Sequence, residues 1–170
     1  TTALNNGKDV VSASKKMLSE HLQELIALQQ STGRSLLYEA SACASIPVIR
    51  NLEEYYDNDL LHSIKAIVNG STNFILTKMF EEQLSFKEAL LLAQQLGFAE
   101  TDPTLDIEGF DAANKWVLLL THSYGINTSI DKMLFNGITQ INEHDAKVAQ
   151  SKNQSIKLVA QAQKLANGTV

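Results

Sequence analysis

Apolar residues recur at intervals of three and four along much of this chain, which is the spacing of one helix face. In the clearest case Leu18, Leu22 and Leu25 share a face, and Gly33 follows the pattern. A glycine just after the last apolar position is typical of a helix end, so we predict a helix over 14–30. The same reasoning predicts further helices over 47–55, 72–82, 85–96, 107–124 and 142–151.

Alternating or short apolar runs predict strands between these helices. The stretch 61–68 alternates most regularly, and the runs at 9–11, 35–41 and 155–163 have the length of strands. Within the irregular segment that follows the fifth helix we expect at most one short strand, over 137–141. Because strands alternate with helices, the predicted fold class is α/β (α+β). We expect one mixed β-sheet with its helices mostly on one face.

Local signals indicate where several helices begin and end. Asn69 stands in the turn Asn69-Gly70-Ser71-Thr72 and can cap the helix that follows. Ser85 and Glu88 have the spacing of a capping box, which predicts a helix start at that point. Gly97 closes the same helix.

Composition excludes function classes more than it identifies one. The 170 residues carry a net charge of −5 without a run of Lys or Arg, so we expect no nucleic-acid partner. No apolar run approaches the ~20 residues of a membrane span, so we expect no membrane partner. The single cysteine, Cys43, cannot form an internal disulfide, which favours a reducing compartment and a cytoplasmic location. We interpret one acidic cluster as a solvated helix end: Glu53, Glu54, Asp57 and Asp59.

Candidate chemistry is concentrated between Phe98 and Lys115. Lys115 precedes the apolar run 116–120, which predicts a buried helix. Asp111 and Lys115 are four residues apart and therefore share a helix face. One interpretation is a surface ion pair; the other is a half-buried lysine beside carboxylates that acts as a general acid or base. Five acids stand in this segment: Glu100, Asp102, Asp106, Glu108 and Asp111.

Other charged residues leave a similar choice open. Asp106 either stabilises a helix start or, together with Glu100 from the preceding loop, faces a cleft, where the two acids would hold a substrate ammonium or hydroxyl. Lys15 is either a solvated lysine or a partner for an anion at a helix N-terminus. Glu39 either faces solvent or contributes to a cation site. We expect Cys43 to be a small packed residue.

Four separated blocks resemble homoserine dehydrogenases and stand in the order that this family has them. The resemblance implies NAD(P)-dependent interconversion of L-aspartate 4-semialdehyde and L-homoserine, on the route to threonine, methionine and isoleucine. It also implies a homodimer or homotetramer. The blocks are Val10–Lys15, Tyr38–Ser41 with Ile46–Ile49, Ile67–Leu76 and Gly97–Lys115.

The resemblance also implies residue roles. Lys115 would donate the proton to the carbonyl oxygen, and Asp111 would support the lysines. Lys15, next to Ser14, would lie by the nicotinamide and the reacting oxygen. The substrate would be bound by Glu100, Asp106, Gly70, Ser71 and Phe98.

A Na⁺ or K⁺ site is a further implication of the resemblance. It would consist of the Glu39 side chain and the carbonyls of Ala42, Ala44 and Ile46. This sequence departs from the family here, because Cys43-Ala44-Ser45 replaces a glycine-rich stretch. It departs again at Ser14, where the family has asparagine.

The glycine-rich turn of a dinucleotide-binding domain does not precede Val10. We therefore expect a fragment that is inactive alone. In this interpretation residues 1–33 end the nucleotide-binding domain, and 34–170 form a C-terminally truncated substrate-binding, catalytic and dimerisation domain. A non-catalytic dimerisation or amino-acid-binding module stays open as the alternative.

Overall fold

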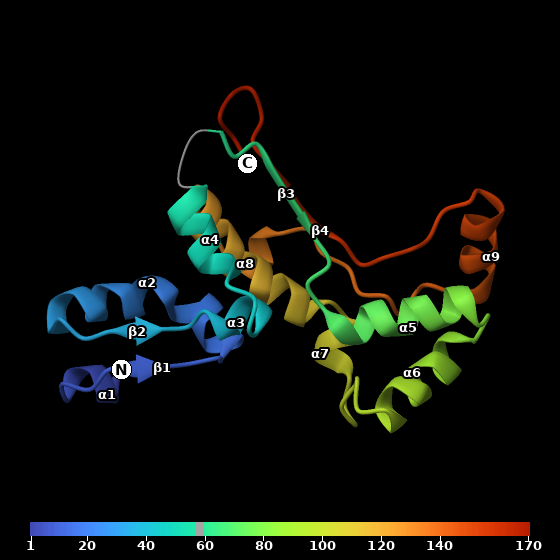
Figure 1. Cartoon of the computed structure of the whole chain (residues 1–170), viewed down its shortest axis with the longest axis horizontal. Helices are drawn as coiled ribbons and strands as arrows, with labels where there is room; N and C mark the ends of the chain where they lie inside the picture. Colours follow the sequence, from blue (N-terminus) through green and yellow to red (C-terminus); the bar gives the residue numbers. More distant parts are fainter. Residues whose placement is uncertain (57–59) are drawn as a thin grey trace. The chain divides into compact units, whose positions relative to one another are not determined.

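The computed structural model describes residues 1–56 and 60–170 (Figure 1). Asp57 and Asp59 of the predicted acidic cluster lie outside the described residues. The chain divides into two compact units, which are described separately. The first unit comprises Thr1–Ile64, Asn114–Met133 and Ala162–Val170, and the second comprises Lys65–Ala113 and Leu134–Gln161.

A parallel strand pair and a long helix organise the first unit (Figure 1). Strand β1 (Val10–Val11) pairs with β2 (Leu36–Leu37), and Val10 lies opposite Leu36. Helix α2 (Lys15–Thr32) makes the crossover that a parallel pair requires. One buried cluster of this unit consists of Leu18, Leu22, Leu25, Leu36 and Leu118. Short elements complete it: α1 (Thr2–Asn5), α3 (Ala40–Cys43), α4 (Val48–Tyr55) and the 3₁₀ turn η1 (Ile130–Lys132).

The second unit is built around helix α5 (Gly70–Glu81). Helices α6 (Phe86–Gln95), α7 (Thr104–Ile107) and α9 (Glu143–Ser151) each contact α5. Apolar side chains from α5, α6 and two connecting segments form a buried cluster, which consists of Ile75, Leu76, Met79, Ala89, Ala93, Ala99 and Ile138.

Three elements contain residues that are assigned to both units: α8 (Phe110–Tyr124), β3 (Ser63–Ala66) and β4 (Ala160–Gln163). Strands β3 and β4 pair with each other. Helix α8 carries the run Trp116–Leu120, and all five of these side chains are buried as predicted.

The predicted fold class is confirmed as helix-rich α/β, and all six predicted helices are present within a few residues of their expected bounds. Glycines end two of these helical segments in the left-handed conformation, Gly33 at φ +63° and Gly97 at φ +78°. The predicted capping box is also present, since Ser85 Oγ and the Glu88 carboxylate each accept from the other's backbone N–H.

The single mixed sheet is not what the structure shows. The described strands form two two-stranded sheets, β1–β2 and β3–β4. The predicted strand 35–41 ends at Leu37, because the Tyr38 carbonyl accepts from Ser41 N at 2.9 Å and Ser41 Oγ at 2.6 Å. These bonds turn the chain into α3. The strand predicted over 155–163 begins only at Ala160.

The strand predicted over 137–141 is wrong, because the described backbone there makes bends and turns. Gly137 packs directly on the backbone of Ile107 and Glu108, where a Cβ atom would overlap the Ile107 carbonyl oxygen. That same oxygen accepts from Ile138 N at 2.7 Å. The segment is therefore fixed by a close backbone contact that has no signature in its own side chains.

Candidate functional site

Asn69 contacts two acidic residues of the second unit. Its side chain is buried, with 5% of the residue exposed. The amide nitrogen donates to Asp106 Oδ1 at 2.6 Å and to Asp111 Oδ2 at 3.0 Å. The amide oxygen accepts from Thr72 N at 2.8 Å, which confirms the predicted cap of α5. Two predicted site residues, Asp106 and Asp111, are thus brought to one amide group.

Gly70, Ser71 and Phe98 lie beside the start of α5. Gly70 is the first residue of that helix, and Ser71 Oγ donates to the Phe98 carbonyl at 2.6 Å. The Phe98 ring stacks on Phe74 with the ring centroids 4.4 Å apart. Phe98 nevertheless stays 52% exposed, so it offers an aromatic surface next to α5.

Glu100 has an exposed side chain on a backbone that is held in place. Gln94 of α6 donates to the carbonyls of Glu100 at 3.0 Å and Thr101 at 3.1 Å. Asp102 has a local role, because its carboxylate accepts from Thr104 Oγ1 and Thr104 N. These hydrogen bonds lower the pKa of Asp102, and the second of them satisfies a donor in the first turn of α7.

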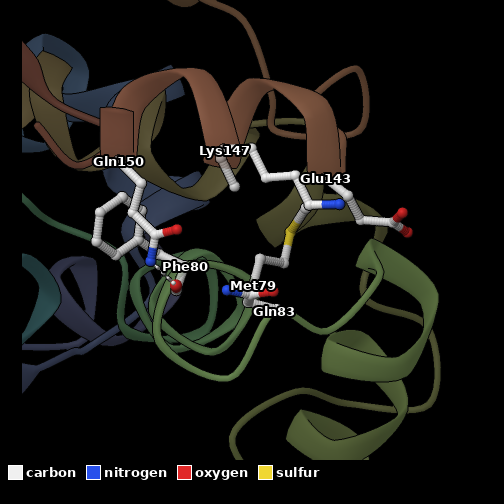
Figure 2. Close-up of a pocket in the computed structure, with 7 residues that line it drawn as sticks. Met79, Phe80, Gln83, Glu143, Lys147 and Gln150 are labelled. Carbon is white, nitrogen blue, oxygen red and sulfur yellow. Dashed lines mark hydrogen bonds between the residues drawn. The ribbon is translucent and has the colours of Figure 1, made fainter. Parts of the chain in front are cut away.

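A small pocket of about 50 Å³ lies between α5 and α9. Gln150 donates to the Phe80 carbonyl at 3.1 Å along one side of it (Figure 2). The volume suits a few water molecules and not a metabolite. None of the described residues that line it is a predicted site residue. The lining consists of Met79, Phe80, Gln83, Glu143, Ala146, Lys147 and Gln150.

Lys15 and Ser14 stand at the start of α2 in the first unit. Lys15 is the first helical residue and is half-buried. Ser14 is the N-cap, but its side chain makes no cap hydrogen bond. Its backbone N–H donates instead to Ser12 Oγ at 3.2 Å. A lysine at the positive end of an 18-residue helix is suited to an anionic group.

Glu39 holds the beginning of α4. One carboxylate oxygen accepts from Ile49 N at 2.9 Å and the other from Arg50 N at 3.0 Å. Sequence reasoning missed this role, because the carboxylate reaches ten residues along the chain.

The carbonyl ligands expected for a monovalent cation lie in the segment between Glu39 and α4. Ala42 is in α3, and Ala44 follows it with φ +52°. The Ile46 carbonyl accepts from Val48 N at 2.8 Å. Among residues 1–56 and 60–170 no group of three or more His, Cys, Asp or Glu could hold a metal ion. A site made of one carboxylate and several carbonyls is not of that kind, so the cation site stays a prediction.

Lys115 is half-buried on α8, between the buried residues Asn114 and Trp116. It acts electrostatically on Cys43, which is also half-buried. Burial raises the pKa of the Cys43 thiol, the positive charge of Lys115 opposes this rise, and the Glu39 carboxylate adds to it. Lys115 and Glu39 are therefore both close enough to Cys43 to influence its thiol.

Tyr38, His122 and Glu53 form a hydrogen-bonded series that sequence reasoning missed. Tyr38 Oη lies 3.0 Å from His122 Nε2, and His122 Nδ1 lies 2.6 Å from Glu53 Oε1. Glu53 is thus a partner of a histidine as well as part of an acidic cluster. The three residues are far apart in sequence, and no local pattern could have joined them.

In the described part of the chain, no helix is long and apolar enough to cross a membrane.

Comparison with protein families gives one clear match. The family model described as homoserine dehydrogenase matches residues 47–170. The homoserine dehydrogenase of Bacillus subtilis (strain 168) is 40% identical over 162 residues, which are 95% of this chain and 37% of that protein. The homoserine dehydrogenase of Methanocaldococcus jannaschii is 40% identical over 159 residues, or 94% and 47% of the two chains.

Solved structures agree with this match. A homoserine dehydrogenase from Thiobacillus denitrificans superimposes with a TM-score of 0.91 at 35% identity, covering 96% of this chain and 38% of that one. A hyperthermophilic archaeal homoserine dehydrogenase mutant in complex with NADPH gives a TM-score of 0.77 at 33% identity, with 95% and 47% covered. These relatives are oxidoreductases. The chain belongs to the homoserine dehydrogenase family, and it spans less than half the length of these relatives.

Proposed function

We propose that the chain supplies the substrate-binding and catalytic region of an NAD(P)-dependent homoserine dehydrogenase, which interconverts L-aspartate 4-semialdehyde and L-homoserine. The observation that supports this most strongly is the pair Asp106 and Asp111 on the Asn69 amide. Paired carboxylates provide counter-charge for the ammonium group that both amino acids carry. Lys115 follows Asp111 by one turn of α8 and is half-buried.

The proposed roles divide the candidate residues into two groups. Asp106 and Glu100 bind the substrate amino group, and Ser71, Gly70 and Phe98 form the surface beside it. Lys115 donates a proton to the aldehyde oxygen during reduction, so that the developing oxyanion becomes the hydroxyl of L-homoserine. In the reverse direction the same lysine accepts that proton. Asp111 supports the charged form of the lysine, since an opposite charge favours it.

Lys15 and Ser14 are proposed to face the cofactor. The start of α2 fits an anionic group, because a half-buried lysine stands at the positive end of the helix dipole. NADPH or NADH, when bound, would supply the hydride that reduces the aldehyde carbon. Lys15 would then orient the reacting carbonyl and stabilise negative charge on its oxygen.

Several further features belong to the same proposal. They are the place in threonine, methionine and isoleucine biosynthesis, a homodimer or homotetramer, and a Na⁺ or K⁺ ion held by Glu39 with the carbonyls of Ala42, Ala44 and Ile46. The division into a nucleotide-binding end at 1–33 and a substrate-binding domain at 34–170 also stays a proposal.

The first test measures activity directly. The 170-residue chain is mixed with NADPH and L-aspartate 4-semialdehyde, and a matched assay uses an intact dehydrogenase that carries the chain. We expect turnover from the intact enzyme and none from the chain alone. Turnover by the chain at a normal rate would contradict the proposal that it is inactive by itself.

The second test separates a substrate site from a non-catalytic module. Calorimetry with L-homoserine is carried out on the intact enzyme and on its Lys115→Ala, Glu100→Ala and Glu81→Ala variants. Glu81 is exposed at the end of α5 and serves as the control. Binding that survives Lys115→Ala and Glu81→Ala but is lost in Glu100→Ala supports the proposal. Absence of binding in every form favours a dimerisation module.

A further inference from the structure

We propose that Asn69 is a positioning residue: its amide fixes the distance and orientation between Asp106 and Asp111 while leaving their negative charge intact. This inference rests on the proposed function, which assigns the two carboxylates to the substrate and to the lysines. It adds a residue to the site for which the sequence predicts only a helix cap.

The hydrogen bonds of Asn69 leave its amide no alternative orientation. The oxygen accepts from Thr72 N at 2.8 Å and from Thr72 Oγ1 at 2.9 Å. The nitrogen has two hydrogens and uses them on two acceptors, Asp106 and Asp111. Turning the amide over would place its oxygen against two carboxylates and its NH₂ group against a backbone N–H. The start of α5 therefore sets where the two acids stand.

Capping alone does not explain an asparagine at this position. Asp and Ser cap helices about as well as Asn, because each offers an acceptor oxygen to the first turn. Only an amide side chain of this length also offers two donors in the opposite direction. A Lys or Arg could hold the same two acids, but its positive charge would neutralise one of their two negative charges. The neutral amide holds two like charges together and keeps both available for cationic partners.

Burial strengthens the electrostatic interaction between the two carboxylates that Asn69 contacts. Asn69 is 5% exposed, and Asp106 and Asp111 are partly buried, so water does little to screen the two carboxylates from each other. Without the shared donor they repel each other at close range. Each carboxylate uses one of its two oxygens on Asn69.

The test compares the same substitution at two helix caps. Asn69→Asp keeps an oxygen that can cap α5, but it replaces the NH₂ donor with an oxygen and so places a third carboxylate beside Asp106 and Asp111. Asn142→Asp is the matched control, because Asn142 caps α9 by accepting from His144 N and Asp145 N and is solvent-exposed. Asn69→Ser is the third variant, which keeps an acceptor and removes the donors without adding charge.

In the intact dehydrogenase we expect Asn69→Asp to lower kcat/KM for L-homoserine about tenfold at pH 8, relative to the unaltered enzyme. The kcat/KM of Asn69→Asp relative to the unaltered enzyme recovers as the pH falls towards 6, because protonation of the introduced carboxyl restores an O–H donor. Asn69→Ser loses activity without this recovery, and Asn142→Asp stays within about twofold of the parent. Equal kcat/KM for Asn69→Asp and Asn142→Asp at every pH would overturn the proposal.

Thermal melting tests whether the Asn69 amide holds Asp106 and Asp111 together, even if the unaltered enzyme does not act on L-homoserine. In that case the proposed function fails, but the geometry still predicts that Asn69→Asp melts below Asn142→Asp at pH 8. The difference between the two melting temperatures narrows towards pH 5, because the introduced carboxyl, placed between two carboxylates, binds its proton more readily in the folded state than in the unfolded chain. Identical melting temperatures at both pH values would show that the amide does not hold the carboxylates together.

Discussion

The hydroxyl of Tyr38 lies 3.0 Å from Nε2 of His122. The other ring nitrogen of His122 lies 2.6 Å from Glu53, so one histidine joins a tyrosine before α3 to a glutamate on α4. Burial and, to a smaller extent, the Glu53 carboxylate raise the pKa of Tyr38 to about 12. The neutral phenol is therefore the form that the folded chain prefers.

This preference predicts a loss of stability at alkaline pH. The unfolded chain releases the Tyr38 proton near its ordinary pKa of about 10, whereas the folded chain keeps it until about 12. The stabilisation is complete below pH 10 and is lost as the pH rises towards 12. Tyr38→Phe should lower the free energy of unfolding by about 1 kcal/mol at pH 7, through loss of the hydrogen bond, and should flatten the alkaline decline.

Urea unfolding between pH 7 and 11 checks the Tyr38 prediction. Tyr56→Phe is the control, because Tyr56 is 51% exposed. An alkaline decline of the same slope in Tyr38→Phe and in the parent would contradict the raised pKa.

Lys115→Met should separate catalysis from substrate binding. An interaction that is made mainly in the transition state affects kcat far more than KM. We expect kcat of the intact dehydrogenase to fall about 100-fold or more, the size of a lost general acid, with little change in KM. Steady-state kinetics on Lys115→Met and on the exposed control Lys87→Met make the comparison. If kcat were unchanged, Lys115 would be only an ion-pair partner of its neighbours.

Gly137→Ala should destabilise the second unit. The added methyl group meets the Ile107 carbonyl and the Glu108 backbone, which cannot move aside as a flexible side chain would. We expect a loss of about 3 kcal/mol. Gly125→Ala is the control, because Gly125 has φ +65° but no neighbouring atom within 4 Å of an added Cβ, so only about 1 kcal/mol is lost. Equal losses in urea unfolding would rule out the backbone contact as the cause.

Glu39→Gln should distinguish a cation site from a helix cap. If Glu39 binds an ion, KCl raises the melting temperature of the parent above that in tetramethylammonium chloride at equal ionic strength. Glu39→Gln then abolishes the difference between the two salts. If the carboxylate only holds Ile49 and Arg50, the substitution lowers the melting temperature equally in both salts.

The features that the sequence predicted well are those that short segments determine. Ser85 and Glu88 are three residues apart, and their capping box forms from those residues alone. Gly33 ends α2 for the same reason. The sequence of 35–41 predicts a strand, but the strand ends early and a helix begins, because Ser41 donates a hydrogen bond to the Tyr38 carbonyl. In that segment a local hydrogen bond outweighs a weak strand propensity.

The candidate site was predicted as a set of residues and not as an arrangement. Asp106 and Asp111 stand out in the sequence because acids are rare beside an apolar helix. Their common partner Asn69 lies 37 and 42 residues away, and nothing near it in sequence signals that contact. His122 contacts Glu53 and Tyr38 across longer separations, of 69 and 84 residues. Such pairings depend on tertiary packing, which periodicity cannot encode.

The hydrogen bond from Ser71 to the Phe98 carbonyl has a consequence for ligand selection. A hydroxyl group has one hydrogen and two lone pairs, and this hydrogen is donated to the Phe98 carbonyl. While it makes this bond, the Ser71 hydroxyl offers only lone pairs to a further partner. In the proposed substrate site those lone pairs would accept from an N–H or O–H group and not from a carboxylate, so the bond to Phe98 would favour the ammonium end of a zwitterion beside this hydroxyl.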